Sequence, residues 1–577
     1  MTTRLRLRRR GLWLGIGLVV AAWAVVAAIH LVYARIDSMA GRRAGEAAND
    51  QVSPDEILDG EPLPELRAAR ARFAQAHNHL RSPFVAPVRL LPVVGRQVRS
   101  ADALASAAVK IADTGIEAVT NARVVLDAPH RTGPQRIDVL RRLAEVAASA
   151  NRNLTGLSLG PSDALIGPIA RARDELADDL ERTVTGLRRG SAGARAAADL
   201  LAGPRRILIL AANNAEMRSG SGMFLSAGVM TTDNGTIDVG DLTPTHQLKL
   251  APGLVPLFGD FGDRWGWMNP TQEWRNLGAS PRFDVAGPLA ARMWEARGGG
   301  RVDGVLALDV AALRAILEVI GPVTVNGRRV GDDNVVELLL HEQYVEHAAD
   351  PNQDPRREEL GEIARAVVDA VQDRDWSVAD MARELGEAAR GRHILAWSRT
   401  SDEQEAWESA GVDGAVDPNS VLVGILNRGG NKLDRFLEVD ATIDVDAGDS
   451  ESHVVLRVTL HNPVPTGEPR YVAGPHDSGL AEGEYGGIVA VTLPGAISGL
   501  SVAGYATYAA IGPDGPSYVV APAVRLVRGA TKTLEIRFTL PRGQRSLRIE
   551  PSARVPAVPW RFRDERWTDF EAHLVEW

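Results

Sequence analysis

The spacing of apolar and polar residues divides the chain into a helical first third and a strand-rich remainder. Residues 11–34 read GLWLGIGLVVAAWAVVAAIHLVYA and contain no Asp, Glu, Lys or Arg. A helix of this length can cross a hydrocarbon core of about 30 Å. A cleaved secretory signal has a shorter apolar core, so the pattern predicts a transmembrane helix that stays attached.

Residues 35–204 have helical periodicity and are rich in Ala, Arg, Leu, Glu and Asp. Separate helices are predicted over residues 66–80, 100–126, 136–150 and 163–187. Such a succession of helices predicts a helical hairpin or a small bundle. No candidate chemistry lies here, and the predicted role is that of a spacer.

A central α/β domain is predicted over residues 205–431. It opens with a short apolar run at 207–210, which is typical of a strand buried on both faces. Asn234-Gly235 between two further apolar runs predicts a hairpin. Later, Asp309 can cap a helix that follows a strand at 305–308, and Gly321 ends that helix before a strand at 323–325. This strand–helix–strand unit predicts a right-handed crossover onto one sheet.

Residues 432–577 change to a period of two, as at 454–460 and 534–540, with Pro and Gly in the gaps. Spaced strands without helices predict a β-sandwich of the immunoglobulin-like type. The predicted fold class is therefore multidomain. It comprises a basic tail at 1–10, a transmembrane helix at 11–34, an α-helical spacer at 35–204, a central α/β domain at 205–431 and a β-sandwich at 432–577.

Charge and cysteine content narrow the location and the partners. Five of the first ten residues are arginines. They predict a single-pass protein of the cell membrane with a cytoplasmic N-terminus and an extracytoplasmic main body. The net charge of the whole chain is −9, so the body beyond the basic tail is more acidic still, which argues against nucleic acid as the partner. Cysteine is absent, which excludes disulfides, a thiolate nucleophile and a Cys-ligated metal.

The candidate chemistry begins directly after the first strand of the central domain. Asn213, Asn214, Glu216 and Arg218 are crowded there with two glycines. Amides, a carboxylate and a guanidinium on a loop after a buried strand are typical of a small-molecule site. A tight polar turn that satisfies its own backbone is the structural alternative.

Further cations lie beside aromatic residues or at a helix start. In residues 258–283, Arg264 and Arg275 are interleaved with tryptophans. That pattern is typical of a cleft for a sugar or a polyprenyl phosphate, or of a long loop pinned by its tryptophans. Arg356 and Arg357 begin a helix, where the helix dipole disfavours cations. Either they face an anionic partner or they are ordinary surface arginines.

Three familiar catalytic motifs are excluded by spacing. His341 and His347 are six residues apart and cannot form the HExxH zinc motif. Ser226 lacks the preceding glycine that a nucleophile elbow requires. Residues 298–300 are glycines without the Lys and Ser/Thr of a phosphate-binding loop.

Several segments together resemble a bacterial membrane-anchored family, domain of unknown function 4012. They are ILILAANNAEMRSGSGMF, VDGVLALDVAALRAILEVIGPVTVNG, RREELGEIARAVVDAV, RHILAWS and NKLDRFLEVD. The central part is also distantly similar to the LytR-CpsA-Psr fold. That family consists of anchored extracytoplasmic enzymes that transfer glycopolymers from a polyprenyl-pyrophosphate carrier to the cell wall. The similarity lies in a buried strand feeding an arginine-bearing loop, a later strand–helix–Gly-Pro-Val strand and an arginine-rich helix start.

The second resemblance implies roles for particular residues. Arg218, Arg356 and Arg357 would grip the pyrophosphate through bidentate contacts. Glu216 would hold Mg²⁺ or act as a base. Those enzymes have aspartates after the first strand, where this chain has two asparagines and a glutamate.

Two functions of different classes follow. The first is assembly of a cell-envelope glycopolymer, in which the protein binds or transfers a polyprenyl-pyrophosphate-linked glycan or a cell-wall polymer beside the bilayer. Its predicted catalytic residues are Glu216 and Arg218, and its predicted ligand-binding residues are Asn213, Asn214, Arg264, Arg275, Arg356 and Arg357. The second is a non-catalytic envelope scaffold. The two differ in whether the predicted arginines converge on an open basic cleft.

Overall fold

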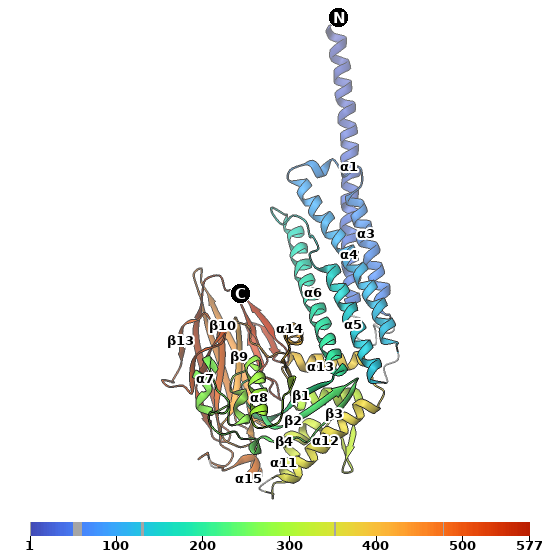
Figure 1. The fold of residues 1–577 in the computed structure, drawn as a ribbon. Helices are drawn as coiled ribbons and strands as arrows, with labels where there is room; N and C mark the ends of the chain where they lie inside the picture. Colours follow the sequence, from blue (N-terminus) through green and yellow to red (C-terminus); the bar gives the residue numbers. More distant parts are fainter. Residues whose placement is uncertain (1, 50–59, 129–131, 351–352, 477) are drawn as a thin grey trace. The chain divides into compact units, whose positions relative to one another are not determined.

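The computed structural model describes residues 2–49, 60–128, 132–350, 353–476 and 478–577 (Figure 1). The chain forms two compact units. The helical unit comprises Met1–Pro129 and Val139–Ala194, and the head comprises His130–Asp138 and Arg195–Trp577. The central and C-terminal parts, which the sequence predicts as separate domains, therefore belong to one compact unit.

The helical unit forms because its apolar residues recur at helical spacing. Its helices are α1 (Thr2–Asn49), α3 (Pro62–Leu80), α4 (Val94–Leu126), α5 (Gly133–Leu154) and α6 (Gly167–Ala202). Small side chains line the contact between α1, α3 and α4, among them the buried Ala27, Ala34, Ala76 and Ala105. The predicted helices are thus present, and most are longer than the periodicity alone indicates.

Helix α1 is the apolar helix predicted at the N-terminus. Among the described side chains, the stretch Trp23–Gly45 is long and apolar enough, by length and composition, to cross a membrane. This stretch overlaps the second half of the predicted span at 11–34. Helix α1 therefore continues beyond the predicted span without a break.

The first sheet of the head is built around β1, the strand predicted to be buried. Its strands are β1 (Arg205–Met217), β2 (Gly222–Asp233), β3 (Thr236–Val239), β4 (Thr243–Pro244), β5 (Gly304–Leu308) and β8 (Ile394–Ser398), in the order β3-β2-β1-β5-β8 with β4 beside β2. Strand β1 is antiparallel to β2 and parallel to β5. The predicted hairpin turn forms because Asn234 and Gly235 both adopt positive φ.

The predicted crossover after β5 is wrong. Asp309 does cap α9 (Val310–Ile320), because its carboxylate accepts from the amides of Ala311 and Ala312. However, β6 (Val323–Val325) pairs only with β7 (Arg328–Val330), in a separate two-stranded sheet. The antiparallel β8 takes the place beside β5 that a crossover would have given to β6.

The head contains further helices besides α9, and Figure 1 shows α7 among the strands of its C-terminal part rather than beside the first sheet. These further helices are α7 (Gly259–Trp265), α8 (Phe283–Ala296), α10 (Val335–Glu337), α11 (Gln343–Glu346), α12 (Asp354–Asp373), α13 (Val378–Arg390) and α14 (Ser401–Ala410). A π-helical turn at Leu338–Glu342 joins α10 to α11. The aromatic segment at 258–283 is mostly helical, and it includes the 3₁₀ helix η4 (Trp274–Ala279).

Two further sheets in the head share one hydrophobic core. One has the order β13-β17-β11-β10-β19-β20, and the other has the order β14-β15-β12-β9-β18-β21 with β16 beside β12. The strands are β9 (Ser420–Asn427), β10 (Glu438–Ala447), β11 (Ser452–His461), β12 (Tyr485–Pro494), β13 (Ser498–Val502), β14 (Ala510–Asp514), β15 (Ser517–Ala521), β16 (Ala523–Leu526), β17 (Thr531–Leu540), β18 (Ser546–Ile549), β19 (Pro559–Phe562), β20 (Glu565–Thr568) and β21 (His573–Glu576). A short helix, α15 (Arg470–Ala473), lies between β11 and β12. Strand β9, which lies before the predicted boundary at 431, pairs with β12 and β18 of these two sheets.

Candidate functional site

The polar residues predicted as a site occupy the distorted end of β1. The pairing of β1 with β2 shifts register after Ala211 and again after Asn213. Register shifts of this kind re-aim side chains and are frequent beside functional sites. Asn213 turns to the hydroxyl of Tyr344 on α11. Asn214 is fully buried and donates to Asp309 Oδ2 at 2.8 Å. The two asparagines therefore bind different parts of the head rather than a common ligand.

Glu216 forms a buried ion pair with Lys432. The distance from Lys432 Nζ to Glu216 Oε2 is 2.7 Å, and both side chains are buried. The ammonium also lies 5.4 Å from the ring centre of Tyr344 and 5.0 Å from that of Tyr471. Burial alone would lower the pKa of Lys432, but Glu216 and the two tyrosines outweigh it and raise the pKa. Lys432 is therefore charged. Its ammonium group is paired with the carboxylate of Glu216, which is one of the two residues predicted to be catalytic.

Arg218 is buried and all of its hydrogen bonds are made inside the head. Its Nε donates to the carbonyl of Arg275 at 2.8 Å. Its Nη1 donates to the carbonyls of Met217 and Asn427, at 3.0 and 2.9 Å. Its Nη2 donates to Asn276 Oδ1 at 3.1 Å. Burial lowers the pKa of Arg218 to about 10, although Glu216 acts in the opposite direction. The hydrogen bonds of Arg218 thus join three segments, namely the end of β1, η4 and the end of β9.

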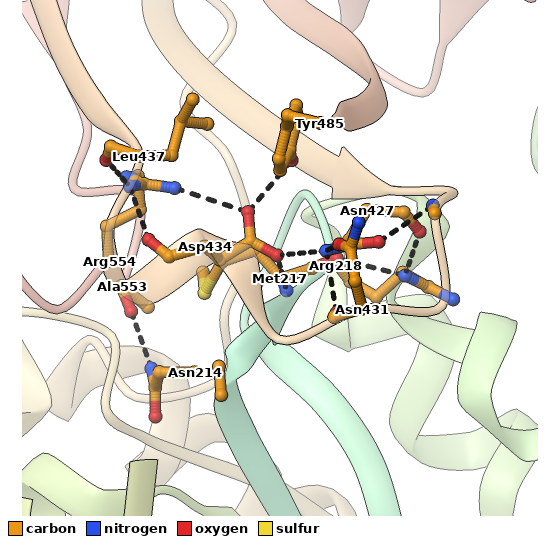
Figure 2. A network of polar contacts seen from close by, with 12 residues as sticks. Asn214, Met217, Arg218, Asn427, Asn431, Asp434, Leu437, Tyr485, Ala553 and Arg554 are labelled. Carbon is orange, nitrogen blue, oxygen red and sulfur yellow. Dashed lines mark hydrogen bonds and ion pairs between the residues drawn. The ribbon is translucent and has the colours of Figure 1, made fainter. Parts of the chain in front are cut away.

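A second buried network holds the segment that follows β9 (Figure 2). Its centre is Asp434, whose carboxylate accepts from the Met217 amide at 3.0 Å, from Asn427 Nδ2 at 2.8 Å and from the Tyr485 hydroxyl at 2.8 Å. Burial raises the pKa of Asp434 in spite of these donors and of the nearby Arg554. The loop from residue 427 to residue 434, which carries Arg428 and Lys432, is consequently fixed at both ends.

Two partly or fully exposed guanidinium groups act on the buried Arg218, and one of them lies over an exposed tryptophan. Arg428 lies 5.4 Å from the ring centre of Trp267, and both side chains are exposed. No hydrogen bond or ion pair joins the Arg428 side chain to another residue among those the structure describes. Arg275 is 39% exposed and forms a two-pronged contact with Glu273 at 2.7 and 2.8 Å. We call Arg275, Arg428 and Trp267 the basic face.

The basic face has more cations than its carboxylates can match. Arg428 and Arg275 each lower the pKa of Arg218, so both positive charges act on the buried guanidinium group. Arg218 and Arg428 have no carboxylate within ion-pair distance among the described residues. Glu273 is already shared between Arg275 and Lys249, whose ammonium is 3.0 Å away. A bound anion would relieve this excess of positive charge.

The other predicted arginines have separate environments. Arg356 lies 4.5 Å from the ring centre of Tyr344 and is buried, and its Nε has no hydrogen-bond partner. Arg357 follows it on α12 and is partly buried. Arg264 on α7 donates to the carbonyls of Ile511 and Pro513, at 2.9 and 3.3 Å. Tyr344 therefore links Arg356 to the Lys432 pair, whereas the hydrogen bonds of Arg264 hold α7 to β14.

A cavity of about 350 Å³ is formed by the aromatic segment that also carries Trp267 of the basic face. Gly266, which lines the cavity, immediately precedes Trp267. The lining combines an aromatic ring, amides, a hydroxyl and one carboxylate, and it is formed by Leu257, Phe258, Gly259, Gly262, Asp263, Gly266, Asn269, Pro270, Thr271 and Gln272. Its size and polarity suit a small polar group such as a sugar ring.

The residues at this site do not fit a protein-held magnesium ion. A magnesium ion is held mainly by carboxylates and water. Glu216 is bonded to an ammonium group, and across the described ranges no three His, Asp or Glu side chains gather as metal ligands would. The implied magnesium role of Glu216 therefore has no structural support.

Several functional candidates were missed from the sequence, namely Arg428, Lys432, Asp434, Tyr344 and Tyr471. Two of them, Lys432 and Asp434, lie in NKLDRFLEVD, one of the segments that carry the family resemblance. A lysine and an aspartate beside asparagine and glycine have the pattern of an exposed turn. The apolar strand that precedes them was the one available signal that this turn starts from the core.

With an apolar N-terminal helix and a head of mixed sheets, the chain is a multidomain protein. Residues 202–344 match the family model described as Protein of unknown function (DUF4012), which confirms the predicted resemblance over this segment. The matched segment contains β1, the basic face residue Arg275, β5 and α9. No curated protein and no solved structure matches the chain. The likeness to the LytR-CpsA-Psr fold stays a prediction.

Proposed function

We propose that this chain is a membrane-anchored protein of the cell envelope whose head binds a phosphate-bearing glycan, of the kind linked to a polyprenyl pyrophosphate. The single observation that carries the proposal is the basic face, where Arg428 has no anionic partner among the described residues and the partly exposed Arg275 acts, like Arg428, on the buried Arg218. The planar fork of a guanidinium group matches phosphate oxygens bidentately, and a phosphate would supply the negative charge that Arg428 lacks. The adjacent cavity would receive the first sugar.

The anchor part of the proposal rests on α1. The helix is long and apolar enough to span a bilayer, and five arginines precede the apolar stretch. Basic residues on one side of a span favour the cytoplasmic side. The head would then lie outside the cell, where glycopolymers are assembled and attached.

The proposal stops at binding and does not include transfer. Glu216 and Arg218, the residues expected to catalyse, are engaged by Lys432 and by four internal acceptors. A base that is already paired with an ammonium is poorly placed to take a proton from a substrate. Arg218 would support the ligand indirectly, by holding the segments that carry Arg275 and Arg428.

The test is an equilibrium titration of the full chain in lipid nanodiscs with a fluorescent polyprenyl-pyrophosphate sugar. Arg428→Ala and Arg275→Ala should each weaken binding roughly tenfold or more, since a charged hydrogen bond contributes about 1.5–3 kcal/mol. Arg563→Ala is the matched control, because Arg563 is also an exposed arginine over an aromatic ring, that of Phe562 at 4.8 Å. Equal affinity in all four proteins would remove the proposed site.

A non-catalytic scaffold is the second candidate, and the closure of the β1 end favours it. Arg218 and Glu216 are both buried beneath the surface, which is what a purely structural polar cluster requires. This candidate predicts that the full chain binds neither the pyrophosphate lipid nor a wall polymer. Deleting the gene would then leave envelope polysaccharides unchanged in amount and composition.

A further inference from the structure

The connection between α3 and α4 presents apolar side chains to its surroundings. We call residues 82–94, with the sequence SPFVAPVRLLPVV, the α3–α4 loop. Five large side chains of this loop are exposed, and they are Phe84 47%, Leu90 85%, Leu91 50%, Val93 72% and Val94 46%. A contiguous group of this kind on a folded protein normally marks a surface that contacts another apolar phase or molecule.

The loop is packed against the outer part of the apolar stretch of α1. Val85 and Val88 are buried in a core that also contains Ala27 and Ala34 of α1. Phe84 stacks on the ring of His30, with ring centres 5.9 Å apart. The α3–α4 loop is therefore held at the level of residues 27–34 of α1.

This contact fixes the depth of the loop if α1 spans the membrane as proposed. A hydrocarbon core of about 30 Å is crossed by roughly 20 helical residues at 1.5 Å each. A span that begins at residue 11 leaves the core near residue 30. We infer that the α3–α4 loop lies in the outer leaflet of the bilayer, beside α1, as a second membrane contact. This inference rests on the proposed anchoring role of α1.

The backbone of the loop is suited to an apolar environment. Non-helical backbone at membrane depth is tolerated only when its polar groups are satisfied internally. Residues 83, 87 and 92 are prolines and have no amide hydrogen. The other amides from residue 82 to residue 91 all donate within the loop or to the end of α3, at 2.9 to 3.3 Å. Few backbone amides of the loop would therefore lose a hydrogen bond to water on entering the bilayer.

The charges of the loop also suit an apolar environment. Arg89 is the one charged residue between positions 82 and 94. Its guanidinium forms an ion pair with Asp102, with Nη2 2.6 Å from Oδ2. The charge of Arg89 is therefore neutralised within the protein. Arg81 and Arg96 lie on either side of the loop in the sequence, where their side chains could reach the lipid phosphates at the membrane surface. Lipid is thus a better occupant of this surface than water.

The bare face of α1 continues the same surface. Val25, Ile29 and Val32 recur at helical spacing and are about half exposed or more. They adjoin the part of α1 on which the loop packs. A second copy of the chain could cover such a face, but the continuity with the spanning helix favours the bilayer.

The experiment uses the natural absence of cysteine in the chain. Single-cysteine variants Leu18→Cys, Val93→Cys and Val124→Cys of the full chain are labelled with a polarity-sensitive fluorophore and reconstituted in phosphatidylcholine–phosphatidylglycerol vesicles. Val124 is the matched control, because it is an equally exposed valine at the far end of α4, about 45 Å along the helix axis. Doxyl-labelled acyl chains then report contact with the hydrocarbon.

The probe at position 93 should lose fluorescence with doxyl lipids and emit at shorter wavelength, as the probe at position 18 does, while the probe at position 124 does neither. Quenching at position 18 without quenching at position 93 would overturn the inference and leave the anchor intact. Absence of quenching at both positions would overturn the anchor as well. Protection of position 93 together with energy transfer between labelled copies would assign the surface to a second chain, and would also overturn the inference.

Discussion

Replacing Arg218 by alanine tests whether this arginine stabilises the fold or binds a ligand. Truncation leaves three carbonyl oxygens and one amide oxygen without their donor inside the head. At about 1–3 kcal/mol for each stranded buried acceptor, the loss is roughly 6 kcal/mol. Burial lowers the pKa of Arg218 from 12.5 to about 10. Removing the charge therefore relieves about 3 kcal/mol, and the net destabilisation is about 3 kcal/mol.

The assay is urea denaturation of the full chain in detergent micelles, followed by tryptophan fluorescence. Trp265 and Trp274 are fully buried in the head and report on its unfolding. With a slope of about 3 kcal/mol per molar urea, the midpoint should fall by about 1 M in Arg218→Ala. Arg428→Ala, which removes an exposed guanidinium, should stay within about 0.5 kcal/mol of the parent protein. An unchanged midpoint in Arg218→Ala, combined with lost affinity for a pyrophosphate lipid, would show that Arg218 binds the ligand and does not stabilise the fold.

Three further predictions concern buried charges. Lys432→Met leaves Glu216 unpaired and should cost about 3–5 kcal/mol, while adding Glu216→Gln should restore most of it in a double-mutant cycle. Burial raises the pKa of Asp569 from 3.8 to about 6. The unfolded chain releases this proton at lower pH than the folded head does, so the head should lose roughly 3 kcal/mol of stability as pH rises from about 4 to 6. Asp569→Asn should abolish this pH dependence. Asp309→Ala should cost more than the ~1 kcal/mol of a lost helix cap, because His393 also loses its partner at 2.7 Å, and the pKa of His393 should fall in an NMR titration.

Each of these has a clear contrary outcome. Lys432→Met and the double variant could be equally unstable, which would mean that Glu216 is not the group stranded by the mutation. Stability that rises between pH 4 and 6 in both the parent and Asp569→Asn would assign the pH dependence to other carboxylates. A pKa of His393 that is unchanged by Asp309→Ala would show that the two side chains do not interact in solution.

Local signals in the sequence predicted the local structure well. The Asp309 cap and the Asn234-Gly235 turn depend on residues within a few positions, and both are present. The partner of β6 depends on distant competition for the edge of the sheet, and β8, some 70 positions later, occupies that edge. The run that became β9 is apolar on both faces, which is equally compatible with a parallel α/β strand and with the core of two packed sheets.

The sequence predicts a polar cluster at the end of β1, and the roles of its residues in binding or catalysis stay a prediction. The polar end of β1 does gather charged groups. Yet the partners of Arg218 are carbonyls at positions 275 and 427, which are 57 and 209 residues away. Every residue has a main-chain carbonyl, so its use as an acceptor cannot be predicted from residue identity. An arginine that joins segments through carbonyls therefore has the same local sequence pattern as an arginine that binds phosphate. Lys432 was missed for the same reason, because only folding brings it to Glu216.

Hydrogen exchange of the full chain in nanodiscs, with and without a polyprenyl-pyrophosphate sugar, tests the binding site most directly. If the lipid-linked sugar binds at the basic face, exchange should slow in residues 266–276 and 427–433, which carry part of the cavity, Arg275 and Arg428, and should stay unchanged in β19 and β20. Slower exchange confined to other parts of the head, or no change at saturating ligand, would rule out binding at the basic face.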